Sequence, residues 1–256
     1  MAGDLDGKTA LVSGGGRGIG RGIAIKLASA GALVAVNYAG NAEAAEQTVR
    51  DIVAAGGKAF PLQARLGAIS EINKLVAALG DELKTRTGSD GLDILVNNIG
   101  GAGPGNTANT SEELYDWTFS NNVRSPFFLT QSLLPTIRDE GRIINISSST
   151  TRSPSTSFIA YSMSKKALEQ FTLILAKELG GRRITVNSVA PGYVETPAVA
   201  DTLNDPAMVQ AIKNMTLFER IGQPEDIADM VHALVGAAGR WVTGQNIEVS
   251  GGFRMT

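Results

Sequence analysis

The stretch "TALVSGGGRGIG", residues 9–20, is the strongest indication of the fold class, because a short β-branched and apolar run leads through glycines into a helix-periodic segment. Glycines let the backbone turn sharply and let amide N–H groups approach a pyrophosphate at the positive N-terminus of the following helix. The spacing is Gly14, Gly18 and Gly20, so no strict G-x-G-x-x-G register fits, and the loop lacks the lysine of a P-loop. A plain strand-to-helix turn is the alternative. The position directly after a strand favours phosphate binding.

Six similar apolar runs follow along the chain, separated by segments with helical periodicity. The seven predicted strands span 9–14, 32–38, 58–64, 92–98, 142–147, 183–190 and 246–250. Repeated strand–helix units build a parallel sheet that is covered by helices on both faces. We therefore predict a single α/β domain over residues 1–256, doubly wound, with a seven-stranded parallel sheet.

Local signals place several helix ends and one irregular region. Three predicted helices, at 19–31, 41–57 and 161–181, end at glycines suited to a C′ position. Thr110 has capping-box spacing to Glu113 and predicts one long helix that ends before Pro135, and Pro224 starts another helix. Residues 193–221 are the least regular and carry scattered apolar side chains, so we predict a mobile apolar flap that covers a substrate.

The composition excludes several classes of function. A formal net charge of -2 without a long basic run argues against nucleic acid or an anionic membrane as the main partner. The chain has no cysteine and one histidine, His232, so neither a disulfide framework nor a thiolate or histidine metal site is expected. The N-terminus is acidic where a signal peptide would be basic, and no apolar run reaches membrane-spanning length. We expect a cytoplasmic protein without a metal.

A tyrosine and a lysine stand four positions apart in the helical stretch "YSMSK", residues 161–165. Residues i and i+4 share a helix face, so the Lys165 ammonium should lie close to the Tyr161 ring. A nearby cation stabilises phenolate and would lower the phenol pKa from about 10 toward neutrality. The pair therefore predicts a general acid, although a pair with this spacing also arises by chance.

The end of the second strand bears on the choice of nucleotide. In "VNYAGNAE", residues 36–43, no acid stands where one would bind the ribose 2′-hydroxyl of NAD. Asn37 and Tyr38 occupy that place, and Arg17 in the glycine loop could meet a 2′-phosphate. A solvated loop charge is the alternative for Arg17. The pattern favours NADP(H) over NAD(H).

Together these motifs resemble the classical short-chain dehydrogenase/reductase family over nearly the whole chain and in the same order. Besides the glycine loop, the resemblance rests on "NNIG" at 97–100, the asparagine of "NNVRSPFF" at 121–128, "NISS" at 145–148, "VAPGYVET" at 189–196, "RIGQPEDIA" at 220–228 and "VTGQNIEVSGG" at 242–252. It implies a Rossmann-type fold and a homotetramer.

The resemblance also implies roles for individual residues. Tyr161 would donate a proton to a carbonyl oxygen, Ser148 would hydrogen-bond that oxygen, Lys165 would bind the nicotinamide ribose, and Asn122 would hold a water that links Lys165 to solvent. The residues expected to bind the dinucleotide are Gly14, Arg17, Gly18, Ile19, Gly20, Asn37, Tyr38, Asn98, Gly100, Tyr161, Lys165, Pro191, Gly192, Val194 and Thr196.

Two residues depart from the family pattern. Arg65 occupies the usual place of an aspartate that binds the adenine amino group, so adenine contact must differ, by stacking on the arginine or without it. Ile99 replaces a small alanine beside the cofactor and could shift the loop or narrow the pocket.

Within the family, the chain resembles the 3-oxoacyl-carrier-protein reductases. The leading functional hypothesis is therefore an NADPH-dependent oxidoreductase that reduces a ketone, either a 3-oxoacyl group or a small carbonyl compound. Asp139 and Glu140, expected in a turn before the fifth strand, weaken the reading of an acidic carrier protein as partner. The alternative is a secondary alcohol or sugar dehydrogenase that works in the oxidative direction. A non-catalytic dinucleotide sensor is the remote alternative, disfavoured because the tyrosine, lysine, serine and asparagine are all present.

Overall fold

The seven predicted strands form one parallel sheet in the computed structural model, which describes residues 3–254. They are β1 Thr9–Val12, β2 Leu33–Tyr38, β3 Lys58–Gln63, β4 Leu92–Asn97, β5 Ile137–Ile146, β6 Thr185–Pro191 and β7 Asn246–Val249. Their order across the sheet is β3-β2-β1-β4-β5-β6-β7, and every neighbouring pair is parallel. The strand order reverses between β1 and β4. In such sheets ligands bind at this reversal, beyond the carboxyl ends of the strands.

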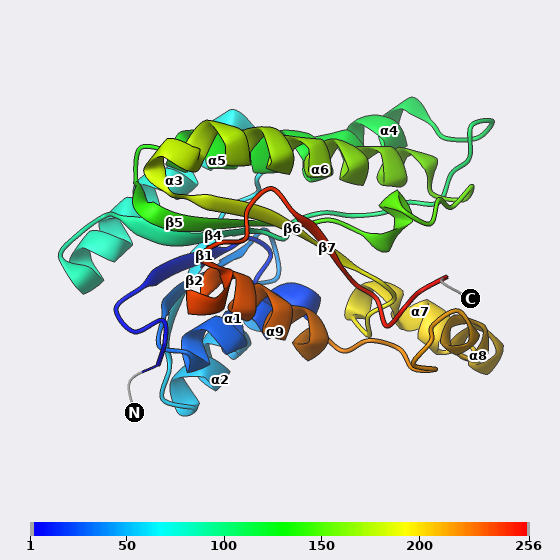
Figure 1. The fold of residues 1–256 in the computed structure, drawn as a ribbon, viewed down its shortest axis with the longest axis horizontal. Helices are drawn as coiled ribbons and strands as arrows, with labels where there is room; N and C mark the ends of the chain where they lie inside the picture. The colour runs from blue at the N-terminus through cyan, green and yellow to red at the C-terminus, as the bar shows by residue number, and fades with distance from the viewer. Residues whose placement is uncertain (1–2, 255–256) are drawn as a thin grey trace.

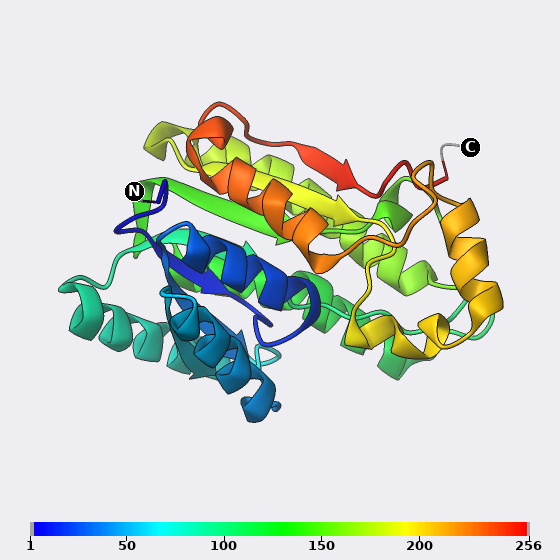
Figure 2. The same ribbon diagram turned by 90° about the horizontal axis from the view of Figure 1, so that it is seen from below.

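Helices cover both faces of the sheet, as Figure 1 shows. One layer contains α1 Gly18–Ser29, α2 Ala42–Ala54 and α9 Pro224–Val235, which lie side by side in Figure 2. The other contains α3 Ile69–Thr87, α4 Glu112–Phe119, α5 Ser125–Leu133 and α6 Ile159–Leu179. A single strand contributes side chains to the cores on both faces of the sheet. In β1, Val12 packs into the buried cluster under α1, and Leu11 packs into the cluster under α3. A strand buried on both faces is mostly apolar along its whole length, which explains why β1 and β4 show no alternation. The edge strand β3, in contrast, alternates between buried and exposed residues.

The predicted long helix before Pro135 is interrupted. Between α4 and α5, Ser120–Arg124 form a π-helical turn, and the N-terminal cap is Ser111, whose hydroxyl accepts a hydrogen bond from the Leu114 amide at 3.2 Å. Thr110 instead donates to the Asn106 carbonyl at 2.7 Å. The predicted N-cap was therefore one residue too early, because the preceding turn uses the threonine hydroxyl.

Helix ends follow the predicted glycines in two of three cases. Gly31 and Gly56, which follow α1 and α2, have left-handed φ values of 106° and 85°. After α6, however, Gly180 is right-handed, and a 3-10 turn over Gly180–Arg182 delays the left-handed residue to Arg183, with φ 55°. Further 3-10 turns span Ser149–Thr151, Pro197–Val199 and Ala237–Gly239.

The segment predicted as a flap contains regular structure. It holds α7 Ala200–Leu203 and α8 Pro206–Asn214, which project beyond the sheet next to the end of β7 (Figures 1 and 2). The C-terminal tail is joined to it, since the Arg254 amide donates to the Met215 carbonyl at 2.7 Å and the Phe218 amide to Gly251 at 3.3 Å. Within residues 3–254, no helix combines the length and apolar character needed to cross a membrane.

Candidate active site

The glycine loop connects β1 to α1 at the carboxyl edge of the sheet. Gly14 and Gly18 have φ values of 63° and 55°, a region that side chains rarely adopt. A Cβ at Gly20 would collide with the Gly14 carbonyl oxygen and would lie 2.5 Å from the side-chain Nδ2 of Asn98. The loop therefore needs glycine for its own geometry, and Gly14, Gly18 and Ile19 stay only half-buried at the start of α1. A glycine turn at a helix N-terminus fits the pyrophosphate of a dinucleotide.

The segment after β4 locks this loop in place. The Asn98 side chain donates to the Ser13 carbonyl at 2.9 Å, and the Asn98 amide donates to the Ser13 hydroxyl at 2.9 Å. Ile99 lies against Gly14, with its Cγ1 3.3 Å from the position of a Cβ on that glycine. The departure at Ile99 is thus a packing contact that closes one side of the loop.

Asn37 supports the loop from below. Its buried side chain donates to the Leu62 and Ala64 carbonyls at 3.1 and 3.2 Å and accepts from the Gly14 amide at 3.3 Å. The expectation that this side chain faces a ribose or phosphate is corrected, because its polar atoms already bind the backbones of β3 and the loop. Arg17, by contrast, is exposed, and Tyr38 is half-buried at the end of β2.

Tyr161 and Lys165 occupy one face of α6, opposite the end of β5. The Lys165 Nζ lies 5.7 Å from the centroid of the Tyr161 ring and donates to the Ile146 carbonyl at 2.8 Å. Ser148, which follows β5, is buried and lies near the phenol. The structure therefore brings together three of the four predicted catalytic side chains.

The electrostatics differ from the expectation that the lysine lowers the phenol pKa. Burial raises the pKa of Tyr161 above its ordinary value, and the Ser148 hydroxyl exerts a smaller opposite effect. Burial also lowers the pKa of Lys165 to about 8. The physical reason is that both side chains are largely removed from water, which disfavours phenolate and ammonium alike. At neutral pH the phenol is protonated and the ammonium is charged.

Asn122 is the fourth predicted residue, and it lies fully buried in the π-helical turn. It accepts from the Gly101 amide and donates to the Gly101 carbonyl, both at 2.9 Å, and donates to the Ser164 hydroxyl at 2.9 Å. A Cβ at Gly100 would lie 2.6 Å from the Asn122 Oδ1 and 2.9 Å from the Lys165 Nζ. Asn122 and Lys165 thus converge on Gly100, at a place that no side chain can enter. Wide π turns occur frequently at functional sites.

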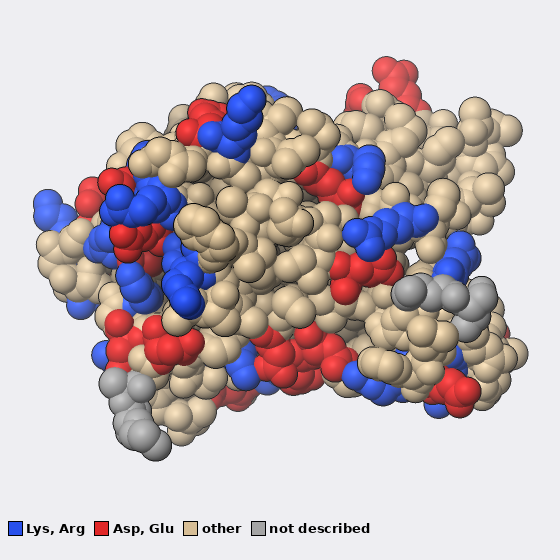
Figure 3. All heavy atoms as spheres, viewed as in Figure 1, with Lys and Arg blue, Asp and Glu red and all other residues tan. Residues whose placement is uncertain are grey.

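The end of β6 and the start of the flap complete the site. Pro191 ends β6, the Gly192 amide donates to the Val249 carbonyl at 3.1 Å, and Val194 forms a bridge with Gly222. Thr196 lies over the glycine loop, because a Cβ at Gly18 would be 3.2 Å from its methyl group. In Figure 3 the molecule is hollowed between the lobe that carries α4 and the lobe that carries α7 and α8.

Two charged features lie elsewhere than the sequence indicated. Asp139 and Glu140 belong to β5 rather than to a turn, and they pair with Arg182 and Arg183 near the amino end of that strand, far from Ser148 at its other end. They therefore say nothing about the entrance of the site, and the argument against a carrier protein loses its basis. Arg65 is exposed beyond the end of β3.

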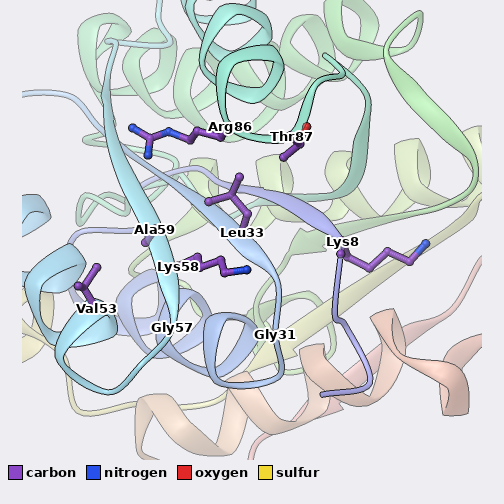
Figure 4. Close-up of a pocket in the computed structure, with 10 residues that line it drawn as sticks. Lys8, Gly31, Leu33, Val53, Gly57, Lys58, Ala59, Arg86 and Thr87 are labelled. Atoms are coloured by element: carbon purple, nitrogen blue, oxygen red, sulfur yellow. The ribbon is translucent and has the colours of Figure 1, made fainter. Parts of the chain in front are cut away.

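A second hollow, of about 470 Å³, lies at the opposite edge of the sheet, near the amino ends of β1 to β3. Its basic side chains include Lys8, which pairs with Asp93 at 3.2 Å, and Arg86, which pairs with Glu82 at 2.8 Å. Figure 4 shows the Lys8 and Arg86 side chains pointing away from each other. The sequence did not predict this hollow, and its cations do not converge on a common point.

Comparison with known proteins identifies the family. The family model described as enoyl-(acyl carrier protein) reductase matches residues 14–254. A probable tetrahydroxynaphthalene reductase of Zymoseptoria tritici is 38% identical over 96% of this chain and 94% of its own length. An NADPH-dependent aldehyde reductase-like protein of Arabidopsis thaliana is 37% identical over 97% of this chain and 95% of its own.

Solved structures agree with this result. The angucycline C-6 ketoreductase LanV, crystallised with bound NADP, superposes with a TM-score of 0.95 at 43% identity and covers 100% of this chain and 99% of its own. The reductase LugOII, which catalyses keto-reduction at C1 during lugdunomycin biosynthesis, has the same TM-score at 43% identity, covering 99% of this chain and 100% of its own. The sheet order, the glycine loop and these matches over the whole chain lead to one conclusion: this protein is an NAD(P)-dependent oxidoreductase of the classical short-chain dehydrogenase/reductase family.

Proposed function

We propose that the protein reduces a ketone to a secondary alcohol with NADPH. The observation that carries the proposal is the convergence of Tyr161, Ser148 and Lys165 beside a glycine loop that fits a dinucleotide. Bound NADPH supplies the hydride that reduces the carbonyl carbon. All other steps fall to side chains of this chain.

Tyr161 is the proposed proton donor. As the carbonyl carbon accepts hydride, its oxygen gains negative charge and takes the phenolic proton, which yields the alcohol and a phenolate. The Ser148 hydroxyl donates a hydrogen bond to the same oxygen and stabilises the developing charge. The raised pKa of Tyr161 keeps the phenol protonated at neutral pH, which is the state that reduction requires. A water held by Asn122, which meets Lys165 at Gly100, links the lysine to solvent, and solvent thereby replaces the proton that the phenolate takes up again.

NADPH rather than NADH is the proposed cofactor, with Arg17 as the residue that meets the 2′-phosphate. We expect Arg17→Ala to weaken NADPH binding about tenfold or more and to leave NADH binding unchanged, because a charged hydrogen bond contributes about 1.5–3 kcal/mol. Titration of the protein with each nucleotide, followed by fluorescence, measures both affinities.

Arg21→Ala is the matched control for this prediction. Arg21 follows in α1, but its guanidinium pairs with Asp51 at 2.8 Å, so its loss should affect both nucleotides equally. Equal losses of NADPH and NADH affinity in Arg17→Ala would contradict the assignment.

The proposed substrate is an apolar ketone, with ring ketones as the first choice. The flap exposes Met208, Leu217 and Phe218, and Tyr193 at its start packs on Phe253 of the C-terminal tail with ring centroids 5.7 Å apart. Large exposed apolar side chains near a site favour binding of an apolar ligand. The names of the similar proteins support this choice, since tetrahydroxynaphthalene and the angucyclines contain fused rings.

Loss of NADPH absorbance in the presence of a panel of ketones tests the proposed function. The panel should contain fused-ring ketones, small aliphatic ketones and a 3-oxoacyl thioester, with each alcohol and NADP⁺ assayed for the reverse reaction. We expect the fastest reduction with the fused-ring ketones. Consumption of neither NADPH nor NADH with any member would contradict the enzyme and favour the sensor.

A homotetramer is the proposed assembly. The outer face of α4, α5 and α6 exposes six large apolar side chains: Tyr115, Trp117, Phe127, Met163, Leu173 and Ile174. A groove of about 580 Å³ on this face carries both Asp116 and Arg124, which makes it suitable for a self-complementary two-fold contact. Trp241, which is 94% exposed shortly before the last strand of the sheet, marks a second surface. Two separate surfaces can join four chains.

Light scattering of the purified protein tests this assembly. We expect the mass of four chains, and we expect Leu173→Glu to reduce it to that of a smaller oligomer, because a charge buried at an interface without a partner is strongly disfavoured. A monomeric wild-type protein would contradict the proposal.

A further inference from the structure

Three consecutive residues immediately before Ser148 are each bound to α6. Asn145 and Ile146 end β5, and Ser147 follows them. Asn145 Nδ2 donates to Thr172 Oγ1, Lys165 Nζ donates to the Ile146 carbonyl, and Ser147 Oγ donates to Glu169 Oε1, each at 2.8 Å. The last of these contacts involves a buried carboxylate that the proposed chemistry does not use.

Glu169 lies one helical turn beyond Lys165 and is only 8% exposed. Its Oε1 accepts from Ser147 and from the Asn246 side chain at 2.6 Å, and its Oε2 accepts from Lys166 at 2.9 Å. Buried carboxylates are stable only where such donors replace water. Because its oxygens bind these three donors, Glu169 acts as an acceptor with fixed partners.

The contacts of Glu169 join the elements that carry the site. Asn246, at the start of β7, accepts in turn from the Ser188 hydroxyl of β6 at 2.9 Å. Glu169 therefore links α6 to the end of β5 directly and to β6 and β7 through Asn246. These links are side-chain contacts, so they add to the backbone ladder of the sheet instead of repeating it.

We infer that Glu169 is a positioning residue that fixes Ser148 relative to Tyr161, an inference that rests on the proposed function. The two reacting side chains come from different elements, since Ser148 follows β5 and Tyr161 belongs to α6. Their separation therefore depends on how α6 is held against the end of β5. Ser147 is joined to Ser148 by one peptide bond, so the Ser147 contact with Glu169 acts closer to Ser148 than the other two contacts. Displacements of about 1 Å can change rates by about a hundredfold.

Three variants test this inference: Glu169→Ala, Glu169→Gln and Ser147→Ala. We expect Glu169→Ala to lower kcat about tenfold and Ser147→Ala about threefold, at a nearly unchanged dissociation constant for NADPH, because both free the serine segment without touching the glycine loop. Glu169→Gln should keep kcat within about twofold of the wild type, since the amide oxygen can still accept from Ser147 and Asn246. Rates are expressed per NADPH-binding site, counted by fluorescence titration. A merely structural role would reduce the number of sites and leave kcat per site unchanged.

Thr172→Val is the matched control. It removes the contact with Asn145, which is of the same kind but three residues away from Ser148, so it should lower thermal stability and leave kcat per site within about twofold. The inference is overturned if Glu169→Ala and Ser147→Ala keep the wild-type kcat per site, or if Thr172→Val loses as much as they do. A wild-type protein that reduces no ketone would instead overturn the proposed function, which keeps the two failures distinguishable.

Discussion

Replacing Tyr161 by Phe is expected to lower kcat for ketone reduction by a factor on the order of 10² to 10⁴, the usual contribution of a general acid. The substitution removes one oxygen and keeps the ring, so the packing of α6 against β5 should remain. Burial keeps the pKa of the phenol above its ordinary value, and its proton is therefore present across the neutral range. The affinity for NADPH should change by no more than about threefold, since the glycine loop is untouched. Stopped-flow or steady-state loss of NADPH absorbance measures the rate, and fluorescence titration measures the affinity.

Tyr115→Phe provides the control for this experiment. Tyr115 is exposed on α4, where its ring stacks on Phe119 with centroids 4.5 Å apart, and the proposed chemistry assigns its hydroxyl no role. We expect kcat to stay within about twofold of the wild type, because surface substitutions outside a site have small effects. A Tyr161→Phe protein that retained the activity of this control would mean that another group supplies the proton.

Replacing Lys165 by Met is expected to lower kcat by a factor on the order of 10² to 10³, because the substitution removes the ammonium that lies 5.7 Å from the centroid of the reacting phenol ring. Burial depresses the pKa of this ammonium to about 8. A lysine is charged below its pKa, so the wild-type rate should be constant toward neutral pH and fall as the pH rises through about 8. The variant should lack that step, and a pH–rate profile from pH 6 to 10 measures it.

Lys177→Met is the matched control, because this lysine also belongs to α6 but is exposed near the end of the helix, three turns away from Lys165. Surface substitutions away from a site usually have small effects. We expect a nearly normal rate and an unchanged pH profile. Retention of the step near pH 8 in Lys165→Met would assign it to another group.

The sheet and the glycine loop could be predicted from the sequence because their signals are local. Continuous apolar runs such as 92–98 and 183–190 indicate strands buried on both faces. The glycines at 14, 18 and 20 come directly after the first predicted strand of the chain. The predicted sheet is confirmed by the parallel pairing of all seven strands. The prediction that residues 193–221 are irregular was wrong in part. Asp205 caps α8 and Pro206 stands in its first turn, so this part of the segment is helical.

Features that depend on contacts between distant segments could not be predicted. The sequence indicates only that Asn37 lies near the end of a strand. The structure shows that β3 and the glycine loop approach it, and that its side chain is hydrogen-bonded to their backbones. The direction of the Tyr161 pKa shift has the same origin, because helical spacing locates Lys165 but says nothing about how deeply both groups are buried. Glu169 carries no motif, and its role emerges only where α6, β5 and β7 meet.

The π turn at Ser120–Arg124 has a consequence for protein engineering. Each wide turn accommodates one residue more than the α-helical path, so every side chain after it is rotated by about 100° relative to an uninterrupted helix. A chimaera that takes α4 from a relative must therefore keep the number of residues between α4 and α5, even where the flanking sequences align without a gap. Deletion of one residue from this turn would convert it to regular α-helix and turn the Asn122 side-chain amide away from Gly101. The same deletion in an exposed loop would change only the loop.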